Sequence, residues 1–572
     1  MRNREHNNKD TLIVQKSTGD EILRQKISLL NGQEILDFFL EQTDARKTVQ
    51  NLPEGDFYWL VKKIGENDCL PLIELASKNQ LQYILDIEIW KKDRMDVNIT
   101  FNWLHRILLS DPERLAKWIF EDLQKTAALF FLKTIQVDIR EEDEPYNIKE
   151  GFFTLDGTFY IKSMNEDMNE DIQLLCRAMA RVDLKNYHNL ILNFTGILPA
   201  ETEEELYRLR NVRLAEHGFL PYDEAIAIYS PLKKTALKQK GQTVKASKWI
   251  QEEETGNSVP ILPIFYAQDF TALIKAFYDV HNHGYTDKLK MEFAALCNTI
   301  ISANTNHADN FDTLVKICRQ AAGYLNIALE HTCGDDTRLA VETIINNPLD
   351  SVFRVGFGMA LKLKWKAKQW LQKSWFKRQG FDNTFWGDMY GGVLTGVLLE
   401  RPMFCINKDQ KEEFRSFESM SELKEATDIL DKIIALDNLL ESLEMETEDR
   451  PSFPDHTTFI PLVFNFWSRK FLGMKPSFSG ISIEKAKEMF AMLRIQDKHP
   501  PFQMKGFEQQ FISDMMKHLP PTEHNTDDML KKALSELWNM FKETFMSVSI
   551  DNLDPRYMMD FIWAEEKTRL QG

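Results

Sequence analysis

The sequence predicts a mostly α-helical protein built from stacked helical repeats in a superhelical arrangement, with one small β-hairpin insertion. Helix-start signals recur at nearly every turn of the stretch 51–118. Between them, apolar residues follow helical spacing, as in Phe57, Leu60, Val61 and Ile64, which marks one buried stripe. Helices of about ten residues with short links cannot bury their apolar faces singly, so we expect them to stack.

Capping chemistry predicts the helix ends within this stretch. Asp56 is expected to cap the first helix, and Gly65 to end it in a left-handed conformation. Ser77 followed by Gln80 forms a capping box, in which each side chain accepts from the other residue's amide. The Asp-Pro pair at 111–112 is the clearest start, because proline loses no hydrogen bond at the first helical position.

We predict five parts along the chain. They are a flexible N-terminus (1–20), an N-terminal helical repeat domain (21–145), a segment with the β-hairpin insertion, helices and a Lys-rich linker (146–256), a central helical domain (257–445) and a C-terminal helical domain (446–572). The hairpin is placed at Asp156-Gly157, because this pair between two β-prone runs favours a tight turn. A second capping box is expected at Ser419 and Glu422, and Asp554-Pro555 should start the last helix.

Composition limits the class of protein. The 572 residues carry a net charge of −17, which argues against general nucleic-acid binding because phosphate contacts need a surplus of Lys and Arg. The six cysteines lie far apart and form no C-x-x-C pair, which favours a reduced, intracellular chain. No secretory signal follows the charged amino terminus, and no window approaches the ~18 apolar residues of a membrane span. The sequence therefore predicts a cytoplasmic location.

The stretch Leu361 to Arg378 has the most unusual composition, because it holds seven cations and no acid. On a helix, one face would carry Leu363, Ala367, Trp370 and Ser374. The nearly opposite face would carry Lys362, Lys366, Lys373 and Lys377, with Trp365 on the solvent side.

This stretch has two interpretations. The first is a cationic contact surface for an acidic protein partner, an anionic membrane or nucleic-acid phosphate, in which Trp365 suits a contact residue. The second is a packed helix whose lysines pair with the protein's own acids, as charged runs on helices usually do. A short strand over 361–366 also fits the period-two alternation of its apolar residues.

His281 and His283 are the metal candidates. Two histidines at i and i+2 share a face of an extended segment and could both bind a divalent metal, with His307 or Cys297 as a third ligand. The alternative is a loop after a helix with solvated histidines, because a zinc site needs three or four ligands and only the pair is local. The pair supports an alternative function, a metal-assisted enzyme in the central block.

Other motifs argue against familiar chemistry. Gly356-Phe357-Gly358 lacks a third glycine and a preceding strand, so it does not predict a dinucleotide loop. Gly392 and Gly396 more readily let two helices approach than bind phosphate. No nucleophile elbow, zinc-protease helix or phosphate-binding loop occurs, and no catalytic residue or other cofactor is predicted. The favoured function is therefore an interaction or regulatory scaffold for a protein partner, with peripheral membrane contact as a weaker option.

Four runs carry a family resemblance: GDFYWLVKKIGENDCLPLIELASKNQLQYILDIEIW, HGFLPYDEAIAIY, SVFRVGFG and FRSFESMSELKEA. They resemble an uncharacterised bacterial family, domain of unknown function 6178. That family has no established activity, so the resemblance implies no site residues. A weaker similarity is to the helical repeats of magnesium-transporter cytosolic domains and flagellar motor switch proteins, whose helix pairs also begin with Pro and an acidic residue. This chain departs from them, because no membrane segment follows and no carboxylate cluster for magnesium can be placed.

Overall fold

The structure is a computed structural model, and it divides the chain into two compact units. Unit 1 is Met1–Gly356 and unit 2 is Phe357–Gly572, so the division falls inside one long helix, α20. The residues described are 29–140, 150–194, 198–237, 271–281, 286–304, 310–408, 411–445, 453, 456–495, 500–519, 524–551 and 553–563. Most of them are helical and the sheets are small and antiparallel, which confirms the predicted fold class. No helix in this part is long and apolar enough to cross a membrane.

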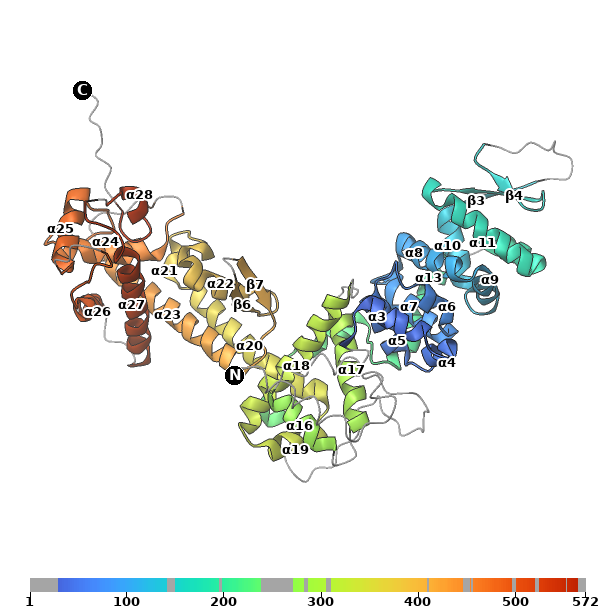
Figure 1. Cartoon of the computed structure of the whole chain (residues 1–572), viewed down its shortest axis with the longest axis horizontal. Helices are drawn as coiled ribbons and strands as arrows, with labels where there is room; N and C mark the ends of the chain where they lie inside the picture. The colour runs from blue at the N-terminus through green and yellow to red at the C-terminus, as the bar shows by residue number, and fades with distance from the viewer. Residues whose placement is uncertain are drawn as a thin grey trace. The chain divides into compact units, whose positions relative to one another are not determined.

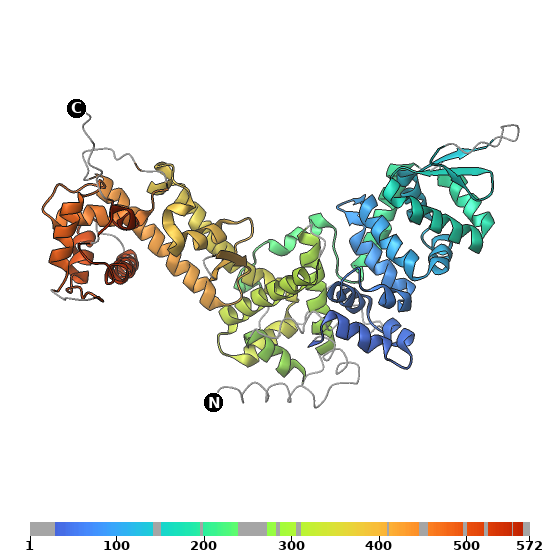
Figure 2. The same ribbon diagram turned by 45° about the horizontal axis from the view of Figure 1, so that its top comes forward.

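Unit 1 begins with short helices that stack in alternation (Figures 1 and 2). The helices are α3 (Gly32–Leu40), α4 (Ala45–Gln50), α5 (Glu54–Ile64), α6 (Leu70–Leu75), α7 (Lys78–Glu88), α8 (Val97–Ser110), α9 (Pro112–Glu121) and α10 (Gln124–Thr134). Helix α5 packs between α3 and α7, and α6 packs between α4 and α8. These helices therefore pack against the next helix but one, as stacked helical pairs do.

Most of the predicted helix ends in this stack are confirmed. Ser77 and Gln80 form the capping box at the start of α7, and the Asp111 side chain accepts from the Arg114 amide at the start of α9. Gly65 ends α5 with a φ of 103°. The prediction for Asp56 is wrong, because α5 begins at Glu54 and places Asp56 inside its first turn, where it is buried.

The predicted hairpin is confirmed at Asp156-Gly157, and it belongs to a larger sheet than expected. Strands β4 (Phe153–Thr154) and β5 (Phe159–Ser163) pair across this turn, where Gly157 has a φ of 74°. Strand β3 (Ile135–Ile139) adds to the free side of β5, which gives the order β3-β5-β4. Two further small pairs are β1 (Trp90–Lys91) with β2 (Arg94–Met95), and β6 (Phe404–Lys408) with β7 (Lys411–Arg415).

The rest of unit 1 is again helical, and much of it packs around α18. Its elements are η2 (Glu166–Met168), α11 (Asn169–Val182), α12 (Leu184–Phe194), α13 (Pro199–Ala215), α14 (Tyr222–Ala225), η3 (Ile226–Tyr229), η4 (Lys234–Ala236), α16 (Thr271–His281), α17 (Thr286–Ala303), α18 (Phe311–Cys333), α19 (Thr337–Asn346) and the start of α20 (Leu349–Leu371). Helix α18 contacts α16, α17, α19 and α5, and nearly all its residues from Ala321 to Leu329 are fully buried.

Unit 2 is helical with an aromatic core. Beyond α20, its helices are α21 (Trp375–Arg378), η5 (Asn383–Trp386), α22 (Gly387–Leu398), α23 (Met420–Met445), α24 (Phe459–Phe471), α25 (Ile483–Leu493), α26 (Glu508–Met516), α27 (His524–Phe545) and α28 (Pro555–Met558). The Phe464 ring stacks on Phe511 and Phe541, with centroids 5.2 and 4.8 Å away. Such ring pairs add to the burial of large apolar side chains, so α24 is the centre of this core.

Three sequence predictions in unit 2 have mixed outcomes. Asp554 caps α28 through the Arg556 amide, as expected. The Ser419 hydroxyl accepts from the Glu422 amide, but the Glu422 carboxylate accepts from the amide of Glu418, one residue before the expected capping partner. The prediction that Gly396 lets two helices approach is wrong: a Cβ there would lie 2.7 Å from the Met403 carbonyl oxygen, in the segment that enters β6.

Candidate functional site

The cationic stretch 361–378 is divided between α20 and α21. Its expected apolar face is confirmed, because the side chains of Leu363, Ala367, Trp370 and Ser374 are all buried. A strand over 361–366 is wrong, since these residues lie in α20. Treating the whole stretch as one helix is also wrong, because α20 ends at Leu371 and α21 begins at Trp375.

The Asp437 carboxylate explains the break between α20 and α21. It accepts hydrogen bonds from the backbone amides of Trp375 and Phe376, at 3.0 and 2.9 Å. In a continuous helix these two amides would bond to carbonyls four residues earlier. Asp437, from α23, also accepts from the Trp370 indole at 3.0 Å and is 2% exposed. Burial raises the pKa of Asp437, while these three N–H donors oppose the rise.

Several cations of the stretch are used within unit 2. Lys364 is buried and donates to the carbonyl oxygens of Leu399 and Glu400, at 2.7 and 2.6 Å. Burial, together with the nearby Lys368 ammonium, lowers the pKa of Lys364. Lys366 forms an ion pair with Asp431 on α23. Arg378 likewise pairs with Glu441. The interpretation that the lysines pair with the protein's own acids therefore applies to part of the stretch.

Four exposed residues of the stretch form a surface that we call the α20 basic face: Lys362, Trp365, Lys366 and Lys373. Lys366 belongs to this face although it also pairs with Asp431. Trp365 and Lys366 lie about one helical turn after Lys362 on α20, and Lys373 follows the end of the helix. The Trp365 side chain is 51% exposed. Within the part of the chain that the structure describes, Lys362 and Lys373 are exposed and form no ion pair. The structure thus leaves Lys362, Lys373 and one large indole in contact with solvent, and Lys368 and Lys377 of the same stretch are exposed as well.

The metal candidates fall largely outside the described residues. His283 and His307 lie outside the described residues. His281 is the last residue of α16, and the structure does not describe its side chain. Cys297 is described: it is buried on α17, with its sulfur 3.7 Å from that of Cys318. No cluster of three or more His, Cys, Asp or Glu able to hold a metal occurs among the described residues. The histidine site stays a prediction.

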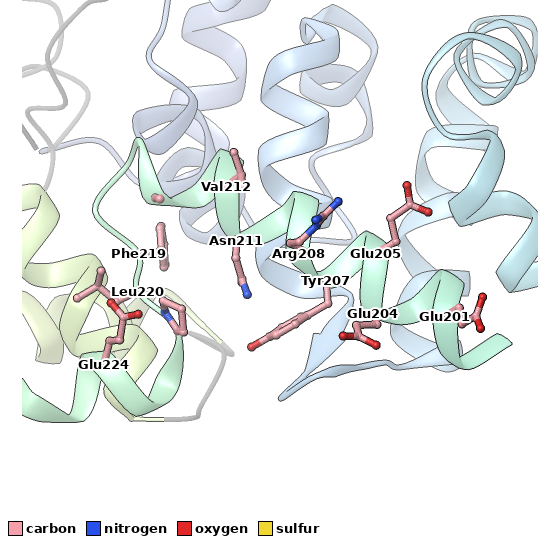
Figure 3. Close-up of a pocket in the computed structure, with 12 residues that line it drawn as sticks. Glu201, Glu204, Glu205, Tyr207, Arg208, Asn211, Val212, Phe219, Leu220 and Glu224 are labelled. Carbon is pink, nitrogen blue, oxygen red and sulfur yellow. The ribbon is translucent and has the colours of Figure 1, made fainter. Parts of the chain in front are cut away.

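An open groove of about 700 Å³, not predicted from the sequence, lies along α13 in unit 1 (Figure 3). We call it the α13–α14 groove. Its acidic residues are Glu201, Glu204, Glu205 and Glu224. Its other lining residues are Tyr207, Arg208, Asn211, Val212, Ala215, Phe219, Leu220 and Pro221. In Figure 3, Glu204, Tyr207 and Asn211 point from α13 toward the side where Phe219 and Leu220 lie.

The opposite side of α13 is anchored by a buried carboxylate. Glu203 is 4% exposed and accepts from Arg94, Lys133 and the Met95 amide, at 2.8, 2.7 and 2.9 Å. Burial alone would raise the pKa of Glu203, but these hydrogen bonds outweigh burial and hold it below the usual value. Arg213, near the end of α13, adds a bidentate pair with Asp86, both bonds being 2.7 Å.

The Glu203→Gln variant is expected to lose about 2 kcal/mol of unfolding free energy, because a charged acceptor for three donors becomes a neutral amide. A lowered folded pKa means that the carboxylate stabilises the fold above its unfolded pKa of roughly 4.3 and loses this contribution as pH falls through the folded pKa. The difference between wild type and variant should therefore shrink on acidification below about pH 4. Denaturant unfolding across pH checks this, with Glu204→Gln as a neighbouring exposed control; a pH-independent difference would contradict it.

These features define a class of protein: a mostly helical chain whose conspicuous surfaces are a groove and a cationic helix face. Comparison with known families then places the chain. It matches the family described as "Family of unknown function (DUF6178)" over residues 15–564. The chain therefore belongs to this family, which confirms the resemblance of its sequence. No curated protein and no solved structure matches it.

Proposed function

We propose that this protein is an interaction scaffold that presents the α20 basic face to an acidic protein partner. The observation that carries the proposal is Trp365, which is about half exposed next to the unpaired Lys362. Tryptophan is enriched among the residues that dominate binding energy, because one side chain buries a large area at low entropic cost. A cytoplasmic location remains a prediction that accompanies this proposal.

The backbone beneath the face is held in place, which favours binding. The buried side of α20 contacts unit 2 through Trp370 and Ala367, and Asp437 fixes the point where the helix ends. A surface that does not rearrange loses less conformational entropy on binding. Cations at the edge of such a surface attract an acidic partner and raise its association rate. Lys362 and Lys373 can serve this role, because neither pairs with a described acid.

The chemistry of the face favours a protein over a membrane or a nucleic acid. A helix that lies in a membrane interface needs a wide exposed apolar face, whereas α20 turns its apolar side into unit 2. Nucleic-acid binding requires many phosphate contacts, and this chain has a net charge of −17. One indole with a few cations suits a small acidic patch on a folded partner.

Affinity capture from a lysate of the source cells tests the proposal. The triple variant Lys362→Glu, Trp365→Ala, Lys373→Glu should capture one protein in an amount at least about tenfold lower than wild type does. The reason is that the loss of an interface tryptophan costs roughly 2 kcal/mol of binding free energy. The control Lys424→Glu, Lys542→Glu changes two exposed lysines of unit 2 on other helices, and should capture that protein as wild type does.

Equal capture by wild type and the α20 variant would reject the proposal. The same three proteins should also be tested for binding to phosphatidylglycerol vesicles and to a random-sequence DNA duplex. If wild type binds either of these and the α20 variant does not, the surface belongs to a membrane or a nucleic acid and the proposed partner is wrong. Circular dichroism of the variant checks that α20 still folds.

A further inference from the structure

The α13–α14 groove is bounded by two walls that are both fixed before any partner arrives. One wall is α13, which Glu203 and Arg213 hold from behind through hydrogen bonds of 2.7 to 2.9 Å. The other is the link between α13 and α14, whose carbonyls at His217 and Gly218 accept from Asn298 and Thr299 of α17. A preformed groove loses little free energy to ordering when it binds.

The groove combines an apolar base with an acidic rim. Phe219 and Leu220 contribute to the base, and Val212 on α13 is 61% exposed beside them. Among the described residues, Glu201, Glu204 and Glu224 form no ion pair, whereas Glu205 forms an ion pair with Lys125. The groove also contains one cation, Arg208, so its four glutamates still outnumber its cations. An acidic excess around exposed apolar surface favours a ligand that is both cationic and apolar.

The length of the groove favours a helix over a small cation. The α13 wall runs from Glu201 to Ala215, which at 1.5 Å per residue is about 20 Å. A helix of about 14 residues has the same length, and its apolar side chains at i, i+3, i+4 and i+7 can occupy a groove while its backbone stays outside. A volume of about 700 Å³ suits such a row of side chains and is too small for a whole helix.

We propose that the α13–α14 groove binds a basic amphipathic helix of another protein. The apolar face of that helix packs on Val212, Phe219 and Leu220, and its lysines or arginines meet the three unpaired glutamates. This site is separate from the α20 basic face and has the opposite charge, so its partner is a different one. It extends the proposed function and does not depend on it.

Fluorescence anisotropy on the full chain tests the groove with a defined probe. The probe is a labelled peptide of about 14 residues with leucines at helical spacing and lysines between them. A scrambled peptide has the same charge and composition but no apolar face. At about 0.15 M salt, where surface charges are largely screened beyond ~8 Å, wild type should bind the amphipathic peptide at least tenfold more tightly than the scrambled one.

Two variants separate the apolar contribution from simple attraction to an acidic protein. Val212→Glu adds a negative charge, so it should tighten a merely electrostatic association but weaken groove binding about fivefold or more. Glu201→Gln, Glu204→Gln, Glu224→Gln should weaken binding about tenfold. The matched control Glu41→Gln, Glu166→Gln, Glu170→Gln removes the same charge from exposed positions elsewhere in unit 1 and should leave affinity unchanged.

Three results would overturn the assignment. The first is equal affinity of wild type for the amphipathic and scrambled peptides. The second is tighter binding of the amphipathic peptide by Val212→Glu than by wild type. The third is that spermine, at equal charge, displaces the labelled peptide as well as the unlabelled peptide does. Sedimentation compares the oligomeric states of wild type and the triple glutamine variant. If wild type forms an oligomer and the variant is a monomer, the groove is occupied by a second copy of this chain, and the proposed partner is wrong. Because none of these variants touches α20, failure here leaves the proposed function of that face intact.

Discussion

Asp437→Ala is expected to destabilise unit 2 by about 4 kcal/mol, because it leaves three buried N–H groups without an acceptor. The donors are the Trp370 indole and the amides of Trp375 and Phe376, at 2.9 to 3.0 Å from the carboxylate. Each buried donor left unsatisfied costs about 1–3 kcal/mol, and water entering the site would relieve part of this. Asp437→Asn keeps one acceptor oxygen and should lose about half as much.

Hydrogen exchange followed by mass spectrometry is the suitable measurement, because a chain of two units need not unfold in one step. Protection should fall in peptides that cover the end of α20, α21 and the middle of α23, while unit 1 stays unchanged. The control Glu425→Ala removes an exposed acid from the same helix and should change stability by less than about 0.5 kcal/mol. Unchanged protection in Asp437→Ala would show that the carboxylate does not support the helix break.

This contact also determines where the proposed interaction surface ends. Because Asp437 accepts hydrogen bonds from the Trp375 and Phe376 amides, α20 ends at Leu371, and Lys373 lies just beyond its end. Lys366 pairs with Asp431 on the same helix, α23. Helix α23 therefore holds both the end and the middle of α20, and it leaves Trp365 and Lys362 facing solvent.

Local signals account for the parts of the fold that the sequence predicts well. The Ser77–Gln80 box, the Asp111 cap and the Asp156-Gly157 turn each act within three or four residues, so they can be recognised without knowledge of the fold. Strand β3 could not be predicted in the same way, because Ile135 pairs with Ser163, far along the chain. Its preceding helix, α10, offered no local signal that the pattern changes from helix to strand at that point.

The surfaces were less predictable than the helices for a related reason. Helical spacing was enough to predict that Leu363 and Trp370 share a buried face. Helical spacing could not predict which lysines are free and which have partners. Lys366 forms an ion pair with Asp431, and Lys364 donates a hydrogen bond to the carbonyl of Leu399. These partners are dozens of residues away, and only the fold brings them together.

The groove was missed because α13 is largely polar and shows no single apolar stripe. The helix is held by Glu203, which bonds to Arg94 and Lys133. Arg213 adds its pair with Asp86. Polar anchors of this kind leave no periodic signal, so the sequence did not indicate which face of α13 would remain open.

Gly356→Ala is expected to destabilise unit 1 by at least about 3 kcal/mol, although alanine is favoured over glycine in a helix by roughly 1 kcal/mol. Gly356 lies where α20 crosses α18, and a Cβ there would sit 1.9 Å from the Tyr324 carbonyl oxygen. Real Cβ atoms essentially never approach another heavy atom within 3.0 Å, so something must move. The obstacle is backbone, so no side-chain rotation relieves it, and the two helices must separate.

Gly55→Ala provides the matched control, because Gly55 is also a helical glycine of unit 1. A Cβ at Gly55 would meet only the Tyr83 hydroxyl, at 3.6 Å, which is an ordinary contact. This substitution should leave stability unchanged or raise it by up to about 1 kcal/mol, following helix propensity alone. Thermal unfolding with hydrogen exchange over α18 and α20 distinguishes the two variants. If Gly356→Ala were stabilising like its control, the close crossing of α18 and α20 would be wrong. The two glycines of the run Gly356-Phe357-Gly358, set aside from the sequence as a nucleotide loop, both lie within α20, and Gly356 serves there as the contact that lets α20 pack on α18.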